Sequence, residues 1–363
     1  METKKRSFSL PFLSNLFRHS YTEWAALLLF ILLPFIVALL SGQSFAGLVR
    51  NQGGTPKFVE GLAIEVFILA AFAISYDLIL GITGLLSFGH AMFFASGAYV
   101  TGILLKSFGW SLLPTLGMVI LVGVVQALLF AIVLPRVKGV TFALVTLGIS
   151  SVFYILIQST ELNPFTGGDV GLQGVVTPDI INSTAHRMRF YFLALAFITL
   201  VYILYKRFVD SPTGRVCIAG RENEMRARML GYNTFWFKLI ALILASVTAA
   251  MAGYLFALFQ PIVSPYNASM SFTIAAILMT LIGGIGTLSG ALVGAFIYRM
   301  LDYVLTTWFT QRSIFLLGVI YILIVLFLPY GIIGTLRMQS LQIRSGWNRL
   351  IRIFSGKQPT QEQ

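Results

Sequence analysis

The sequence has few of the residues that build metal, redox and nucleophilic sites. Among its 363 residues there is one cysteine, Cys217, and the three histidines are scattered at His19, His90 and His186. A single cysteine excludes an intrachain disulfide, and separated histidines without cysteine partners do not have the spacing of metal ligands. We therefore expect no metal site in this chain, and no cofactor of its own.

Charge is also scarce. Charged residues make up 10% of the chain and hydrophobic residues 57%, with a mean hydropathy of +0.87. Soluble domains contain about 25% charged residues, so this composition indicates a membrane protein. The net charge of +12 comes from basic residues near the ends of apolar runs, as the positive-inside rule predicts, and no nucleic-acid recognition module is present. We expect membrane lipid as a partner and no nucleic acid.

Long apolar runs predict an all-α polytopic membrane protein. A helix needs about 20 apolar residues to span the hydrocarbon, and these runs are too long and unbroken for the alternating strands of a barrel. We expect about eight to ten transmembrane helices, because 270–283 and 314–328 are short and the former is also compatible with a re-entrant segment. The candidate segments are 24–40, 61–80, 84–105, 111–134, 139–157, 190–205, 235–259, 270–283, 287–307 and 314–328.

Loop charges predict the orientation. The loop 206–234 and the tail after 328 are rich in Lys and Arg, whereas the connection 158–186 carries three acidic residues and no basic one. Because basic loops remain in the cytoplasm, we expect both termini inside. The run 24–40 is longer than a signal-peptide core and is expected to remain as the first span. The expected organisation is a cytoplasmic segment 1–23, a transmembrane permease domain 24–328 with a cytoplasmic coupling loop 206–234, and a basic cytoplasmic tail 329–363.

The stretch "GRENEMRARMLGYN", residues 220–233, concentrates charge between two apolar runs. Glu222 with Arg226, and Glu224 with Arg228, have the i,i+4 spacing that stabilises a helix, and Gly231 follows as a C-terminal cap. A short amphipathic cytoplasmic helix is therefore predicted. It is either a solvated loop helix or a protein-docking surface, for which a pair of methionines at 225 and 229 is well suited.

Blocks along nearly the whole chain resemble one family of transporters. They are "GRENEMRARMLGYNTFWFKLIALILASVTAAMAGYLFAL", "DLILGITGLLSFGHAMFFASGAYVTGILL", "VKGVTFALVTLGISSVF", "NPFTGGDVGL", "LIGGIGTLSGALVGAFIY" and "LFLPYGIIGTL". In this order they are similar to permease subunits of ABC importers for branched-chain amino acids, the LivM-type family. The resemblance implies an ABC importer permease fold whose coupling helix, within 221–231, seats in a separate cytoplasmic ATPase. The implied interface residues are Arg221, Glu222, Glu224, Arg226 and Gly231.

The resemblance also implies partners. They are a homologous second permease subunit, two ABC ATPase subunits and an extracytoplasmic solute-binding protein, in a cytoplasmic (inner) membrane. No G-x-x-x-x-G-K-[ST] motif is present, because the one Gly-Lys pair, Gly356 and Lys357, is followed by Gln358 and has Ile351 at the first glycine position. We therefore expect no enzymatic activity here, with ATP and Mg²⁺ bound by the partner ATPases.

Glycine and polar residues mark three further candidate sites. Gly286, Gly290 and Gly294 have the spacing of one smooth helical face, which indicates close helix packing or a moving subunit interface. Glycines interrupt the beginning of the span that starts at 84, beside Ser87 and His90. Because broken helices in transporters expose backbone groups near a substrate path, Ser87 and His90 are candidates for the translocation path. For His90 the alternative is a packing role. The turn-rich outer segment supplies candidates for the mouth where a binding protein docks, or is an ordinary loop. Its members are Asn163, Gly167, Gly168 and Asp169.

Ionisable residues within the spans are few. Glu65 and Asp77 lie near the ends of the second span, and Arg299 and Asp302 can pair at i,i+3 in the ninth. Anchoring is the preferred interpretation over a proton relay. It follows that an ion-coupled carrier is less favoured than an importer driven by separate ATPases.

Several functions remain open from the sequence. The first is ATP-driven import of leucine, isoleucine and valine. Related permeases that resemble this one carry urea or short amides, or other amino acids. A hypothesis from a different class is that the chain is an ATP-independent channel or an ion-coupled carrier. This hypothesis predicts transport by the chain alone. A structural membrane scaffold is the third class.

Overall fold

The computed structural model describes residues 21–42, 54–137, 139–178, 181–328 and 330–335. It confirms an all-α membrane protein, in which a helix overlaps each of the ten candidate segments. Two short strands, β1 (Leu172–Gln173) and β2 (Ile262–Val263), pair antiparallel with Leu172 opposite Val263. The helices that overlap these segments are α2 (Tyr21–Leu40), α4 (Thr55–Asp77), α5 (His90–Lys106), α6 (Leu112–Val133), α7 (Val140–Gln158), α9 (Arg187–Asp210), α12 (Thr234–Phe259), α13 (Met270–Gly283), α14 (Leu288–Phe309) and α15 (Ser313–Phe327).

Seven stretches of the described chain are long and apolar enough to cross a membrane. α13 has 14 residues, or about 21 Å at 1.5 Å per residue, which is less than the hydrocarbon thickness of about 30 Å. It is therefore a short helix, as its sequence predicts.

The segment around Gly84 is the main departure from the predicted spans. α4 continues as a π-helix, η1 (Leu78–Ile82), and residues 83–89 are not helical, so that α5 begins at His90 rather than at 84. Most residues of this break are nevertheless buried. The predicted interruption of a helix is therefore confirmed, but its position is between two helices rather than inside one.

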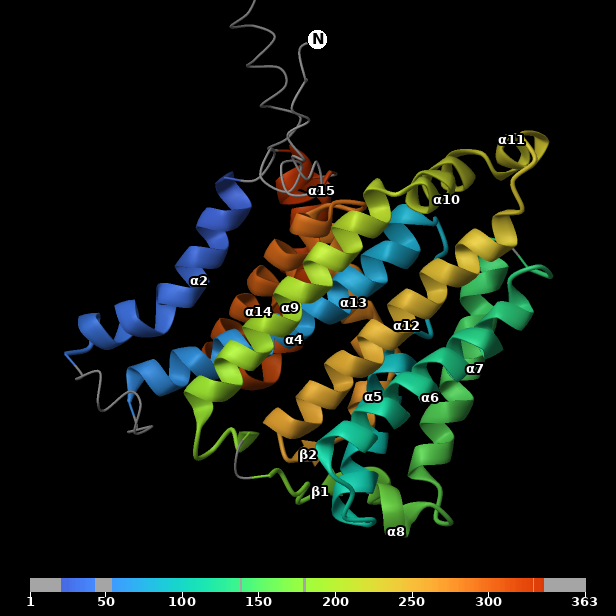
Figure 1. Ribbon diagram of the computed structural model, residues 1–363. Coiled ribbons are helices and arrows are strands. Elements are labelled where there is room, and N and C mark those ends of the chain that lie inside the picture. The colour runs from blue at the N-terminus through green and yellow to red at the C-terminus, as the bar shows by residue number, and fades with distance from the viewer. Residues whose placement is uncertain (1–20, 43–53, 138, 179–180, 329, 336–363) are drawn as a thin grey trace, which may run out of the picture.

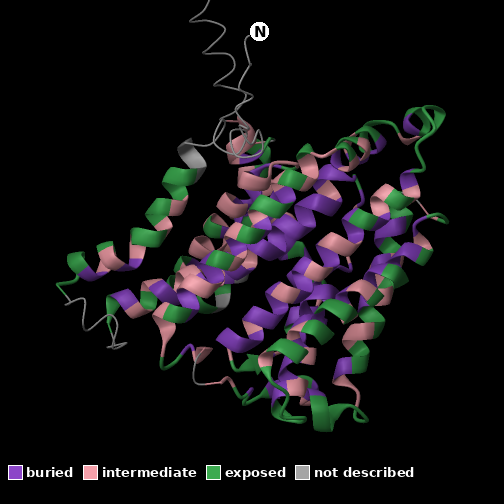
Figure 2. Ribbon diagram, viewed as in Figure 1, coloured by how far each residue is buried: buried purple, intermediate pink, exposed green. Residues whose placement is uncertain are grey.

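The core lies along α4, α5 and α12. Figure 1 shows these helices side by side in the middle of the bundle, and Figure 2 shows that buried residues concentrate there. α12 packs along α5 and α6, and α4 packs along α9 and α14. Rings of Phe72, Phe94 and Phe272 fill the centre, with centroids 5.1 Å apart for Phe72 and Phe94 and 4.9 Å apart for Phe94 and Phe272.

The bundle has two differently built ends. At one end, called the α11 end, the short helices α10 (Pro212–Glu222) and α11 (Glu224–Met229) join α9 to α12 and project from the bundle (Figure 1). At the opposite end, called the α8 end, lie α8 (Asn163–Thr166), the 3₁₀ turns η2 (Gly168–Val170) and η4 (Pro265–Ala268), and both strands. A further 3₁₀ turn, η5 (Thr310–Arg312), connects α14 to α15.

Candidate functional site

The charged stretch forms two helices, not the single helix that its spacing predicts. Ser211 caps α10 by accepting a hydrogen bond from the Gly214 N–H at 3.2 Å, with Pro212 in the first turn. Asn223 separates α10 from α11 and caps α11, because its Oδ1 accepts a hydrogen bond from the Arg226 N–H at 2.9 Å. Asn is a preferred N-cap because its side chain binds an otherwise unpaired N–H. Glu222 and Arg226 thus lie on different helices, and the predicted loop begins after α9 ends at Asp210 rather than at 206.

Glu224 connects α11 to the beginning of α12. Its carboxylate binds the Arg228 guanidinium at 2.7 Å, the predicted i,i+4 pair, and the Lys238 ammonium of α12 at 3.2 Å. Thr234 Oγ1 donates to the same carboxylate at 3.0 Å. A carboxylate shared by two cations and a hydroxyl fixes the direction in which α11 leaves the bundle, because its loss leaves three groups without their acceptor.

Gly231 ends α11 as predicted. Its φ of 87° is in the left-handed region, its N–H donates to the Arg228 carbonyl at 2.9 Å, and the Tyr232 N–H donates to the Ala227 carbonyl at 3.3 Å. These two bonds are those of a Schellman motif, which glycine favours because it has no Cβ. The turn redirects the chain into α12.

The outer surface of α11 is apolar and charged together. Met225, Met229 and Leu230 are 67%, 79% and 73% exposed, and Glu222 and Arg226 are exposed beside them. Flexible thioethers adapt to a partner's groove, and surrounding charges give orientation. This geometry suits a protein-docking surface better than a solvated loop.

Arg221 differs from its neighbours in direction. Its Nη1 donates a hydrogen bond to the carbonyl oxygen of Gly81 in η1, and its aliphatic stem lies against Gly84. Arg221 is an exposed residue overall, but its guanidinium reaches the backbone of η1 in the bundle. A role for Arg221 at an ATPase interface stays a prediction, since the side-chain contacts that the structure describes for it are with Gly81 and Gly84 of the bundle.

The thiol of Cys217 in α10 is buried and donates to the Phe237 carbonyl at 3.5 Å. Burial raises the pKa of this thiol to about 11, with Lys238 opposing the shift. Cys217 is therefore a neutral packing group between α10 and α12 at neutral pH. Within the part of the chain that the structure describes, no group of three or more His, Cys, Asp or Glu side chains is placed to hold a metal ion.

Ser87 lies in the buried break, and His90 is the first residue of α5 directly after it. His90 is fully buried, stacks on Phe72 with ring centroids 5.2 Å apart, and has its Nε2 2.8 Å from Ser75 Oγ. Since Ser75 Oγ donates to the Phe72 carbonyl, the histidine Nε2 is assigned as the donor to Ser75, and Nδ1 is left without a partner. Ser87 is held by a Tyr76 hydroxyl that donates to its carbonyl. These are packing contacts, and a role for either residue in a path stays a prediction.

The predicted mouth residues form one compact turn at the α8 end. Gly167 and Gly168 have φ values of 75° and 55°, and the Gly167 N–H donates to the Asn163 carbonyl at 2.9 Å. Asn163 and Asp169 are exposed on this turn. The structure thus brings all four residues together at the end opposite α11, and docking of a binding protein there stays a prediction.

The three spaced glycines do not lie on one helix. Gly286, with φ of 76°, is in the turn before α14, so the predicted face is confined to Gly290 and Gly294. A Cβ at Gly294 would overlap the Met279 carbonyl of α13, and one at Gly290 would come within 2.7 Å of the Gly283 carbonyl. This face is therefore used for close packing of α14 on α13 within the chain.

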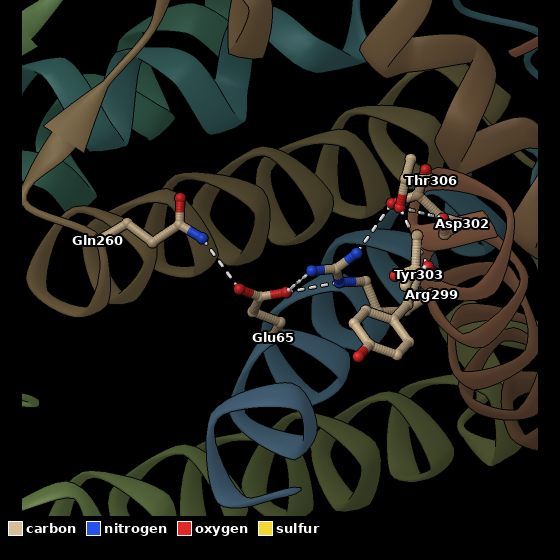
Figure 3. Close-up of polar contacts among 7 residues, drawn as sticks. Glu65, Gln260, Arg299, Asp302, Tyr303 and Thr306 are labelled. Carbon is tan, nitrogen blue, oxygen red and sulfur yellow. Dashed lines mark hydrogen bonds and ion pairs between the residues drawn. The ribbon is translucent and has the colours of Figure 1, made fainter. Parts of the chain in front are cut away.

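One polar network was only half visible in the sequence. Arg299 of α14 binds Asp302 at 2.8 Å, which is the predicted i,i+3 pair, but it also binds Glu65 of α4 (Figure 3). Gln260, directly after α12, donates to the other oxygen of Glu65 at 2.9 Å. Pairing of this kind lowers the cost of charge within a membrane and joins α4, α12 and α14. The separation of Glu65 and Arg299 along the chain gives no local signal for their contact.

Comparison with known proteins agrees with these features. A family model described as the permease component of branched-chain amino acid transport systems matches residues 58–328. The high-affinity branched-chain amino acid transport system permease protein LivM of Salmonella typhimurium is 27% identical over 313 residues, covering 78% of this chain and 72% of its own length. The probable LivM permease of Methanocaldococcus jannaschii is 26% identical over 336 residues, covering 85% and 92%.

A second kind of relative is also similar. The high-affinity branched-chain amino acid transport system permease protein LivH of Escherichia coli K12 is 25% identical over 295 residues, covering 73% of this chain and 91% of its own length. No solved structure matches the chain. The resemblance seen in the sequence blocks is confirmed, and the chain belongs to the family of permease components of branched-chain amino acid transport systems.

Proposed function

We propose that this chain is the permease subunit of an ATP-driven importer that carries branched-chain amino acids across a cytoplasmic membrane. The observation that carries the proposal is the pair of capped, charged helices α10 and α11, projecting from an apolar bundle in a chain that the family model matches over 58–328.

The α11 end is the proposed docking site for an ATPase subunit, one of two in the complete complex. Support comes from the exposed methionines, the charged rim and the local caps that let α11 keep its shape. The sequence has no P-loop, so ATP and Mg²⁺ are assigned to those partners. In this proposal the α11 end is cytoplasmic, together with both termini.

Two further partners are proposed. A homologous permease completes the transmembrane part, supported by the similarity of this chain to relatives named both LivM and LivH. An extracytoplasmic binding protein docks at the α8 end, where Asn163 and Asp169 are exposed on a glycine turn. A binding protein selects the solute before it reaches the permease, so the permease alone does not define the cargo. Urea and short amides are therefore the alternative cargo.

The test is solute uptake by proteoliposomes that contain this chain with its partner subunits. Labelled leucine and labelled urea are offered separately together with the binding protein, with and without ATP in the compartment that holds the ATPases. We expect leucine uptake that requires ATP. Urea uptake that requires ATP would refute the amino acid substrate, and uptake by this chain alone without ATP would refute the importer function as a whole.

A further inference from the structure

Four residues from three distant parts of the chain meet where α10 ends. Arg221 donates to the carbonyl oxygen of Gly81, and the Oδ1 of Asp77 accepts a hydrogen bond of 2.7 Å from the Gly286 N–H. Gly81 lies between these two contacts, because a Cβ added there would come within 2.8 Å of the Gly286 Cα. We call Asp77, Gly81, Arg221 and Gly286 the junction. It links the charged helices to η1 and to the turn between α13 and α14.

The junction contains an unused acceptor. Asp77 is fully buried, and its Oδ2 has no hydrogen-bond partner. A buried carboxylate oxygen without a partner is costly, so its persistence calls for a reason. A Cβ added at Gly286, whose N–H binds Asp77, would come within 3.2 Å of the Arg221 Nη1. The guanidinium therefore lies beside the Asp77 carboxylate, although its hydrogen bond goes to Gly81. The guanidinium, with five N–H donors, thus has a second acceptor in its neighbourhood.

The hydrogen bond to Gly81 is made at an irregular part of the backbone. Gly81 belongs to the π-helix η1, in which the Thr83 N–H donates to the Leu78 carbonyl at 3.1 Å. π-Helical turns are rare and occur often at functional sites. Directly after η1 comes the buried break of residues 83–89, which holds Ser87 and leads to His90. A displacement of the Gly81 carbonyl therefore reaches the break within a few residues.

The other contact of the junction reaches a second pair of helices. Gly286 occupies a left-handed turn that joins α13 to α14, and these two helices pack at van der Waals distance through Gly290 and Gly294. Because such close packing leaves no slack, a shift of the turn moves both helices together. The junction is thus the point at which one side chain of α10 lies against both η1 and the α13–α14 turn.

We propose that Arg221 and Asp77 form a coupling latch. Arg221 is a positioning residue that passes displacement of the α10–α11 unit to η1 and to the α13–α14 turn. In one state its guanidinium holds the Gly81 carbonyl, as in this structure, and in the other it pairs with the free Oδ2 of Asp77. This inference rests on the proposed function, because it takes the α10–α11 unit as the part on which an ATPase acts.

The coupling test compares solute uptake with ATP hydrolysis in the same proteoliposomes, using the full complex. With Arg221→Ala or Asp77→Asn, we expect the solute carried per ATP to fall about tenfold, which is the size of a lost coupling contact. The ATPases should still copurify at the wild-type ratio. Arg215→Ala is the matched control, because Arg215 is exposed on α10 away from the junction, and it should keep the wild-type coupling.

A double variant distinguishes a latch from two separate effects. Since the two side chains act as a unit, Arg221→Ala with Asp77→Asn should lose no more than the more impaired single variant. Losses that multiply, wild-type coupling in Arg221→Ala, or loss of ATPase copurification in that variant would each overturn the latch. Arg221 is an exposed residue, so Arg221→Ala remains decisive even where Asp77→Asn fails to assemble.

A conformational readout separates the latch from the identity of the solute. In a Cys217→Ser background, Ser87→Cys reports the break through its rate of maleimide labelling, because Ser87 is 1% exposed in this structure. We expect ATP to change that rate when Arg221 is present and to leave it unchanged with Arg221→Ala. Absence of leucine uptake with this ATP response intact would refute the proposed substrate alone, whereas no ATP response with Arg221 present would overturn the latch.

Discussion

The two ends of the bundle are held by different kinds of contact. At the α11 end they are mostly local, since Asn223 caps the helix that follows it and Glu224 binds Arg228 within the same helix. At the α8 end they join distant segments, since Leu172 pairs with Val263 and Ser183 Oγ donates to the Phe259 carbonyl at 2.9 Å. A unit with local contacts keeps its shape when it moves, whereas long-range pairing ties a segment to the helices beneath it. We therefore expect α10 and α11 to move as one unit, which we call the lever. We expect the α8 end, which we call the rim, to stay fixed to the bundle.

Reversing the charge of Glu224 should break the lever most strongly. Glu224→Arg removes the acceptor of Arg228 and Lys238 and adds a third positive charge beside them. We expect ATP-dependent uptake to fall by about tenfold or more, because breaking such pairs leaves cations without a partner. The measurement is uptake by the reconstituted complex.

The control for that variant is Glu222→Arg, which makes the same charge reversal at the exposed end of α10. It should lower uptake less, since it lies outside the Glu224 pairs. Equal losses in both variants would mean that net charge at this end matters and the internal structure of α11 does not.

At the rim, adding a methyl group to Gly171 should cost the most stability. Gly171 has a φ of 84°, and a Cβ there would overlap the Val263 carbonyl. We expect Gly171→Ala to destabilise the protein by about 3 kcal/mol, from the left-handed backbone and the clash together. Gly174→Ala isolates the backbone contribution, about 1 kcal/mol, because Gly174 has a φ of 68° with open space around it. Thermal unfolding in detergent measures both, and equal shifts would contradict the role of β1–β2 contact.

A smaller effect is expected from the cap of the lever. Asn223→Ala removes the acceptor of the Arg226 N–H and should weaken α11 by about 1 kcal/mol, or about fivefold in amide protection, whereas Asn223→Gly should cost a few tenths. Hydrogen exchange of residues 224–229 reports this directly. Unchanged protection in Asn223→Ala would show that the partner contacts of α11, and not its own cap, maintain the helix.

The smallest effect belongs to an exposed residue of the rim. Asp169→Arg should leave thermal stability within about 0.5 kcal/mol of wild type, because Asp169 is exposed on the turn. We expect the apparent affinity for the binding protein to fall several-fold through altered charge complementarity. Titrating uptake with binding protein measures it, and an unchanged midpoint would remove Asp169 from the docking surface.

Hydropathy predicted the all-α membrane fold because burial in lipid requires long apolar runs, although seven of the described helices are long and apolar enough to span and α5 begins at His90 rather than at 84. Signals within the charged stretch were also present but were outweighed by charge spacing: Ser211 before Pro212 and Asn223 before Glu224 are both N-cap patterns, and they define two helices. Gly286 was counted as helical from its spacing, although the turn gives it a positive φ.

The contacts that join distant segments were not predictable from the sequence. The pairing of Arg299 with Glu65, and the inward direction of Arg221, depend on how helices far apart in the chain pack together. No local pattern encodes either contact. For the same reason the sequence grouped Arg221 with Glu222 and Arg226, whereas in the structure the Arg221 guanidinium binds the bundle and the other two side chains are exposed.

The measurement that tests the central claim most directly is whether a separate ATPase protects a thiol at each end of the bundle from maleimide labelling. In a Cys217→Ser background, Met225→Cys places a thiol on the lever and Asp169→Cys places one on the rim, both at exposed positions. We predict that adding the ATPase subunits slows maleimide labelling at position 225 and leaves position 169 unchanged. Unchanged labelling at 225, or protection at 169 instead, would contradict the account of α10–α11 as the part that receives work from an ATPase.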